Sequence, residues 1–273
     1  MNGKKIRQAL HDGRRVYGTA MISQSPHWPG ILASAGIDFV FIDTEHTALG
    51  RQTVGEVCHL YKGHGIAPVV RIPSPDPYQA TMMLDGGASG VIAPYIERAE
   101  QVRKLVGAVK YKPLKGERLA QFLKGEKELE PELRDYLIKH NEDTVLIVNI
   151  ESTPALEALD DILSVEGLDG ILVGPHDLTC SLGIPEEYHH PLFIETIESI
   201  IDKARNNQVG VGIHVWDAVG FDQEIEWIKR GANLVVHSND LSLLSGTLRT
   251  NINNIKTALG QSGVDGQDAE PIV

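Results

Sequence analysis

Eight short apolar segments rich in β-branched residues recur along the chain, and longer segments with helical periodicity lie between them. The apolar segments are Val16–Ile22, Phe39–Ile42, Pro68–Ile72, Gly90–Pro94, Val145–Ile150, Gly170–Val173, Val209–Val215 and Leu234–His237. They are apolar nearly throughout instead of alternating with polar residues, which is typical of strands buried on both faces of a parallel sheet. The pattern therefore predicts eight parallel strands.

The segments between these strands have the spacing of amphipathic helices. Helices are predicted at Gln52–His64, Pro77–Asp85, Arg98–Val109, Ala155–Val165, Phe193–Asn206 and Ala218–Arg230. Eight repeats of strand and helix within one domain length predict an α/β fold, a single-domain (β/α)8 TIM barrel. A doubly wound open sheet is the alternative, and the strand count favours the barrel.

Two segments depart from the repeat. Lys110–Thr144 is long, charged and interrupted by proline and glycine, which is typical of functional or disordered loops, and Glu130–His140 within it predicts a helix. Gly260–Val273 is small, polar and acidic. We expect it to form a flexible tail after a barrel domain of residues 1–259.

Composition excludes several classes of protein. The chain has 25 basic and 37 acidic residues, a net charge of −12, and no basic tract, which argues against nucleic-acid binding. Its apolar segments are far shorter than the about 20 residues that span a bilayer. The first residues lack the apolar region of a signal peptide, and two cysteines, Cys58 and Cys180, suit a reducing compartment. We therefore expect a cytoplasmic protein that binds no membrane.

Polar residues follow the predicted strands, where the loops of a barrel carry its active site. The candidates are Asp43, Glu45, His46, Arg71, Asn149, Glu151, His176, Asp177, His214, Trp216, Asp217, Ser238, Asn239 and Asp240. Because the carboxyl ends of parallel strands share one end of the barrel, we expect these side chains to converge on one mouth.

Glu151 and Asp177 are candidate metal ligands. Two carboxylates from neighbouring strand ends suit Mg²⁺ or Mn²⁺, which leave several positions for water and substrate. The alternative is that each carboxylate stabilises the first turn of the helix that follows it. The Gly174–Pro175 bend could also turn the backbone N–H groups of His176 and Asp177 towards an anion.

His46 and Arg71 are the candidate catalytic pair. An imidazole titrates near neutral pH, so His46 is a candidate general base, and Asp43 is close enough to orient its ring. The alternative is a hydrogen-bonded structural histidine. Arg71 offers a planar fork for a carboxylate or a polarised ketone oxygen, or an ion pair with a carboxylate at the mouth.

Four motifs resemble the signature stretches of the HpcH/HpaI aldolase family. They are Phe41–His46, Val69–Arg71, Val148–Glu151 and Gly174–Gly183, and the likeness runs from about Arg14 to about Lys256. The resemblance implies a (β/α)8 barrel, commonly a homo-hexamer whose C-terminal helix packs on a neighbouring subunit. It also implies a class II aldolase that uses a divalent cation (Mg²⁺, Mn²⁺ or Co²⁺) to cleave 4-hydroxy-2-oxo acids reversibly to pyruvate and an aldehyde, through a metal-stabilised enolate.

The resemblance also implies roles for individual residues. Glu151 and Asp177 match the metal ligands, His46 the base with Asp43 orienting it, and Arg71 the residue at the keto oxygen. The amides of His176 and Asp177 match the carboxylate cradle. Asp85 matches an acidic residue that reaches the site across a subunit boundary, Asn149 stands where relatives often carry glutamine, and His214 lies among the substrate-binding positions.

Departures from the family pattern lie on the aldehyde side. Leu119 follows Gly116-Glu-Arg118 where relatives carry glycine, Thr19-Ala-Met21 replaces a tryptophan, and His176 and His214 differ in size or polarity. These departures leave the substrate open.

Two other functions remain as alternatives. An acyl-CoA lyase of the citramalyl-CoA or malyl-CoA type would need basic residues near the mouth, and Lys110–Arg118 is a modest cluster. A barrel without catalysis is the second. No lysine lies in the eight apolar segments, which argues against Schiff-base chemistry.

Overall fold

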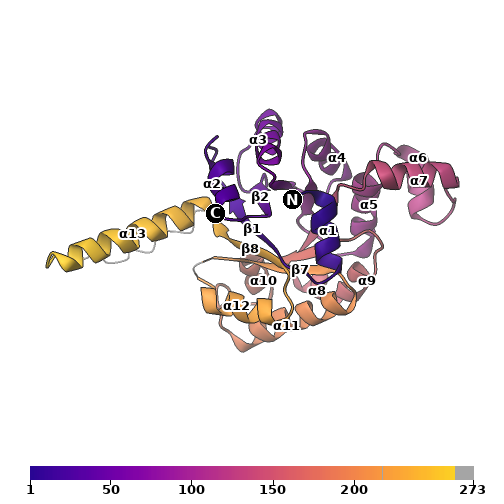
Figure 1. Ribbon diagram of the computed structural model, residues 1–273. Coiled ribbons are helices and arrows are strands. Elements are labelled where there is room, and N and C mark those ends of the chain that lie inside the picture. The colour runs from indigo at the N-terminus through magenta and orange to yellow at the C-terminus, as the bar shows by residue number, and fades with distance from the viewer. Residues whose placement is uncertain (217, 262–273) are drawn as a thin grey trace.

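Eight parallel strands pair in chain order, and β1 closes the ring by pairing with both β2 and β8 (Figure 1). The computed structural model describes residues 1–216 and 218–261. The strands are β1 (Val16–Met21), β2 (Phe39–Asp43), β3 (Ala67–Arg71), β4 (Gly90–Ala93), β5 (Val145–Ile150), β6 (Gly170–Val173), β7 (Gly210–Val215) and β8 (Leu234–Asn239). All eight predicted strands are present, with ends shifted by at most two residues, and the (β/α)8 prediction is confirmed.

Helices surround the barrel. They are α1 (Gly3–His11), α2 (Trp28–Ser34), α3 (Arg51–Gly63), α4 (Pro77–Asp85), α5 (Ala99–Lys110), α6 (Gly116–Leu123), α7 (Pro131–His140), α8 (Thr153–Glu157), α9 (Leu159–Leu163), α10 (Pro175–Ser181), α11 (Pro191–Asn206), α12 (Phe221–Arg230) and α13 (Asp240–Ala258). The described residues contain no helix long and apolar enough to cross a membrane.

One predicted helix needs correction, and one predicted loop contains an additional helix. The helix predicted at Ala155–Val165 is two short helices, because Ala158, at φ −93° and ψ 7°, ends α8 and begins α9. About half of the segment Lys110–Thr144 is helical: α7 confirms the helix predicted at Glu130–His140, and α6 is a second helix that the pattern does not predict. The predicted flexible tail lies almost wholly outside the described residues.

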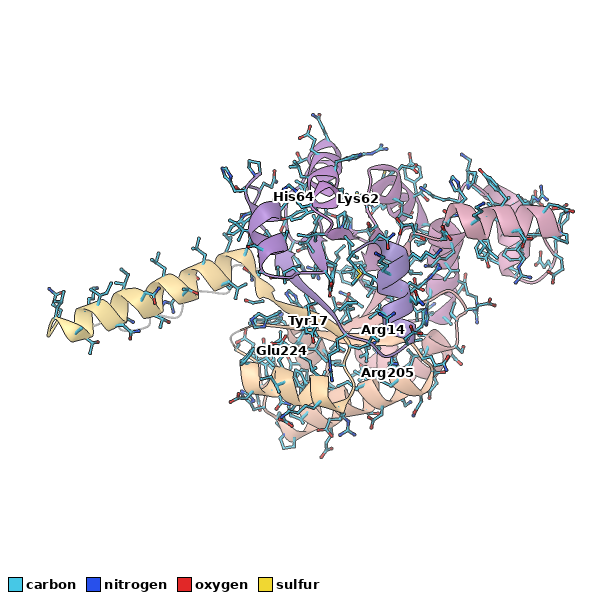
Figure 2. The ribbon with its side chains drawn as sticks, in the orientation of Figure 1. Arg14, Tyr17, Lys62, His64, Arg205 and Glu224 are labelled. Carbon is cyan, nitrogen blue, oxygen red and sulfur yellow. The ribbon has the colours of Figure 1, made fainter. Side chains whose placement is uncertain are left out.

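Alternate strand residues fill the barrel, and α1 closes its amino end. Ile6 and Leu10 of α1 are fully buried against the inward-facing strand residues. A Cβ added to Gly210 would lie 2.8 Å from the Leu10 Cβ, so glycine is required where this helix meets β7. Arg205 Nη1 donates to the carbonyls of Leu10 and Val209, and Figure 2 shows Arg205 beside Arg14 at this end. The carboxyl end of the barrel is therefore the end at which a ligand could enter.

A buried ion group ties α1 and α5 to the start of β6. Asp169 is 1% exposed and accepts from Lys110 Nζ (2.5 Å), His11 Nε2 (3.1 Å) and the Leu146 amide (2.7 Å). Burial opposes ionisation of Asp169, but the Lys110 charge and the hydrogen bonds outweigh it and hold the pKa of this carboxyl below its usual value. The group is therefore an ion pair that depends on both partners.

Replacing Asp169 by asparagine should cost about 3–5 kcal/mol of unfolding free energy, because Lys110 would remain buried without a counter-charge. Asp160→Asn is the matched control, since it removes an exposed partner of Lys203 and should cost at most about 1 kcal/mol. Urea unfolding of both variants measures the difference. Equal losses of unfolding free energy in the two variants would show that burial does not make the Asp169–Lys110 ion pair more important than an exposed pair.

Candidate active site

Strands β2 and β3 bring Asp43 and Arg71 together at the carboxyl end of the barrel. The two residues are paired in register, and Arg71 Nε and Nη2 each donate to one Asp43 carboxylate oxygen at 2.8 Å. The guanidinium also lies over the Phe41 ring, 5.0 Å from its centroid. Burial raises the pKa of Asp43, but the hydrogen bonds from Arg71, the Arg71 charge and the Glu45 amide together outweigh it, and the net shift is downward. The Arg71 guanidinium is thus held in one position and paired with a carboxylate that stays ionised.

Glu45 is the second carboxylate beside Arg71. Its Oε2 lies 3.1 Å from Arg71 Nε and 3.8 Å from His46 Nε2, and the Glu45 side chain is 8% exposed. The carboxylate nearest to the His46 ring is therefore Glu45.

Asp43 acts on the backbone that carries His46. Its carboxylate accepts from the amides of Glu45 (3.0 Å) and His46 (3.3 Å) as well as from Arg71. Asp43 therefore holds the turn and the arginine in this structure, and its role in orienting the His46 ring stays a prediction.

Glu151 follows β5 and is 8% exposed. Its Oε1 accepts from the Tyr95 amide at 2.8 Å, and its Oε2 accepts from Asn149 Nδ2 at 2.9 Å. Burial raises the pKa of Glu151, the negative charges of Asp177 and Glu45 add to that rise, and the two hydrogen bonds only partly offset it. A cation between these carboxylates would relieve the repulsion.

Gly174 leaves open the space where Glu151 and Asp177 converge. A Cβ added there would lie 3.1 Å from Glu151 Oε2 and 3.5 Å from Asp177 Oδ2. Within residues 1–216 and 218–261, no three His, Cys, Asp or Glu side chains form a metal-binding group. Two converging carboxylates still fit a hard divalent cation, which commonly takes its other ligands from water and substrate.

The helix-stabilising alternative differs for the two carboxylates. The cap of α8 is Ser152, whose hydroxyl accepts from the Ala155 amide, so Glu151 does not serve that helix. Asp177 lies in the first turn of α10. It can therefore favour the helix and a cation together.

The start of α10 presents unpaired amides. The first helical hydrogen bond runs from the Leu178 amide to the Gly174 carbonyl, so the N–H groups of His176 and Asp177 have no partner in the helix. The His176 ring is turned to the surface, 3.6 Å from Glu186.

Buried polar atoms without partners line the same mouth. Asn149 Oδ1 and Ser238 Oγ have no hydrogen-bond partner among the described residues. The His214 ring packs edge-on to Phe41, and burial together with the Arg71 charge lowers its pKa to about 4, so it is neutral at pH 7. An unpaired buried polar atom is costly, so these two atoms are available to a ligand or to water at the mouth.

Several predicted residues lie elsewhere. Asp240 accepts from the amides of Ile22 and Ser23, and Asn239 caps α13, so both are structural. Asp85 pairs with Lys112 at 2.8 Å and lines a groove of about 890 Å³ between α3 and α4, away from the mouth of its own chain. Asp217 falls outside the described residues.

Sequence reasoning missed Tyr95. Its amide donates to Glu151 Oε1 at 2.8 Å. The signal that could identify it is its place directly after the fourth predicted strand, Gly90–Pro94.

Comparison with known proteins agrees with this geometry. A profile of the HpcH/HpaI aldolase/citrate lyase family matches residues 21–244. The hydroxypyruvate/pyruvate aldolase of Roseovarius nubinhibens is 30% identical over 259 residues, which is 92% of this chain and 96% of the relative. The 2-keto-3-deoxy-L-rhamnonate aldolase of Salmonella gallinarum is 31% identical over 255 residues, 92% and 93% of the two chains.

A solved structure extends the likeness to three dimensions. The HpcH/HpaI aldolase of Desulfitobacterium hafniense superposes with a TM-score of 0.77 at 28% identity, over 92% of this chain and 96% of that one. The chain belongs to the HpcH/HpaI aldolase/citrate lyase family.

Proposed function

We propose that the protein is a class II pyruvate aldolase, a carbon–carbon lyase that reversibly cleaves a 4-hydroxy-2-oxo acid to pyruvate and an aldehyde. The observation that carries the proposal is the meeting of the Glu151 and Asp177 carboxylates with a fixed, charged Arg71 at one barrel mouth. The aldolase names of the relatives support it.

The residues at this mouth fit a divalent cation, and we assign it to Glu151 and Asp177 as Mg²⁺, Mn²⁺ or Co²⁺. Such a cation supplies a Lewis acid for the charge of a pyruvate enolate. Asn149 Nδ2 and the Tyr95 amide hold the two Glu151 oxygens, so this carboxylate is oriented before any ligand binds.

Backbone amides and side chains of the mouth carry the remaining roles in the proposed reaction. The amides of His176 and Asp177 bind the substrate carboxylate, and Arg71 donates to the keto oxygen. His46 accepts the 4-hydroxyl proton as the C3–C4 bond breaks and its electron pair moves to C3. The aldehyde carbonyl forms as the enolate charge develops beside Arg71.

Three of the four basic residues in the cluster of the acyl-CoA alternative form ion pairs within the chain. Lys110 binds Asp169, Lys112 binds Asp85 and Arg118 binds Glu130. We therefore prefer an aldolase to an acyl-CoA lyase. The oriented carboxylates and the arginine also favour an aldolase over a barrel without catalysis.

Chelation should abolish pyruvate release from generic 4-hydroxy-2-oxo acids, because Glu151 and Asp177 would lose the cation. Adding Mg²⁺, Mn²⁺ or Co²⁺ should restore it, and a coupled pyruvate assay measures both. Borohydride added with pyruvate should trap no adduct. Full activity after dialysis against excess EDTA, or a reduced lysine adduct, would contradict the class II assignment.

Replacing His46 by alanine should lower kcat by about 10²–10⁴ without changing metal affinity, because the residue acts as a base and not as a ligand. Arg71→Ala should also weaken exchange of the pyruvate methyl protons into D₂O. His64→Ala, at an exposed histidine at the end of α3 (Figure 2), is the control and should keep kcat. If His46→Ala lowered Tm but kept kcat, His46 would be structural.

The helix α13 carries our proposal for assembly. After its first turns it extends away from the barrel (Figures 1 and 2), and its exposed apolar stripe comprises Leu244, Leu248, Ile252, Ile255 and Leu259. Such a stripe is stable in water only when covered. We assign it to contacts with neighbouring copies in a homo-hexamer, in which Asp85 would approach a neighbour's mouth.

Leu248→Asp should dissociate the oligomer, because it places a charge in the middle of that stripe. Thr250→Asp adds the same charge to another face of α13 and should leave the assembly intact. Light scattering at micromolar concentration measures both masses. A monomeric wild-type protein with full activity would refute the assignment.

A further inference from the structure

The imidazole of His11, at the end of α1, joins this helix to the starts of two strands. Its Nδ1 lies 2.8 Å from the carbonyl oxygen of Gln208, two residues before β7, and its Nε2 lies 3.1 Å from Oδ1 of Asp169, directly before β6. Gln208 has φ +58°, a left-handed backbone conformation that residues with side chains rarely adopt. His11 thus contacts a strained loop and a buried carboxylate at the end of the barrel that α1 closes.

Both atoms that face the His11 ring are hydrogen-bond acceptors. A backbone carbonyl oxygen can only accept. Burial opposes ionisation of Asp169, but the Lys110 charge and the hydrogen bonds outweigh it, so this carboxylate is also an acceptor. A neutral imidazole carries one N–H group, whereas an imidazolium carries two and satisfies both acceptors. The geometry therefore favours the protonated form of His11.

The charges around His11 act in both directions. The hydrogen bond to Asp169 raises the pKa of His11 above its ordinary value of 6.5, and the Asp169 charge and the Gln208 carbonyl add to the rise. Burial of the ring and the Lys110 charge oppose the rise without reversing it. The other charged side chains close to this end of α1 are Arg7, Asp12, Arg14 and Arg205, of which Asp12 pairs with Arg14 and Arg205 donates to backbone carbonyls.

Loss of the His11 proton leaves one of the two acceptors facing a ring nitrogen without hydrogen. Asp169 would still accept from Lys110 Nζ and the Leu146 amide. The Asp169 carbonyl also accepts from the Gly210 amide at 3.0 Å, so the starts of β6 and β7 are joined without the histidine. The strands can therefore stay paired while the end of α1 is held less firmly.

We propose that His11 is a protonation-dependent latch of α1: the imidazolium holds the end of this helix to the starts of β6 and β7, and the neutral ring weakens that hold. The latch lies at the amino end of the barrel and does not depend on the proposed aldolase function. Because the pKa of His11 is higher in the folded state than the ordinary 6.5, the stabilisation is complete below pH 6.5 and is lost as the pH rises through the folded value.

Amide hydrogen exchange in α1, measured at about pH 6 and about pH 8.5, tests the latch. After correction for the intrinsic exchange rates, protection of the amides in the last turn should fall about three- to tenfold between the two pH values, the net contribution of one hydrogen bond. His11→Gln cannot gain a proton, so its protection should be equal at both pH values and below that of wild type at pH 6. Equal protection in wild type, or the same fall in His11→Gln, would overturn the proposal.

A second variant separates the charge from the other properties of the ring. Arginine keeps its charge at both pH values, so His11→Arg should lose the fall in protection and retain its hold on α1 at pH 8.5. A fall equal to that of wild type would show that a group other than His11 titrates, and would overturn the proposal.

His64→Gln is the matched control. His64 also lies at the end of a helix, α3, and its Nδ1 is 2.9 Å from a backbone carbonyl oxygen, that of Leu60. This variant should keep the pH response of α1 that wild type shows. Loss of the response in His64→Gln would contradict the assignment to His11.

Discussion

Successive residues on a strand point to opposite sides, and in a closed barrel this alternation decides which side chains can meet at the mouth. Phe39 and Phe41 of β2 fill the interior, and Asp43 is the next residue with the same orientation. Arg71 occupies the equivalent place on β3, and the register aligns it with Asp43. A shift of one residue in either strand would turn its charged group into the helical layer, so strand register determines the electrostatics of the site.

Most of the fold could be predicted because continuous apolar segments mark strands that are buried on both faces. Helices that lie apart from the barrel bury fewer apolar residues, so their apolar pattern along the sequence is weaker. The helix α6 has no buried residue, so its sequence resembles a charged loop. The break at Ala158 carries neither proline nor glycine, and the apolar spacing continues through it because both short helices contribute to the same core.

The candidate site was predictable where position along a strand decides the outcome, as for Arg71 and Glu151. The hydrogen-bond partner of each site residue could not be predicted, because it depends on distances of a few ångströms between loops. Asp43 is three residues from His46, yet Arg71 on the neighbouring strand holds its carboxylate more closely than the imidazole does. Tyr95 depends on a left-handed turn after Pro94, which no periodicity reveals.

The closure of the amino end by α1 has a kinetic consequence. With Leu10 packed against the interior at Gly210, substrate and both products exchange through the carboxyl mouth. On the proposed roles, the pyruvate half binds beside Glu151, which is 8% exposed, and the aldehyde half beside His46, whose side chain is 43% exposed. The aldehyde half then lies nearer to solvent, so we expect the aldehyde to leave before pyruvate and, in the synthetic direction, pyruvate to bind first.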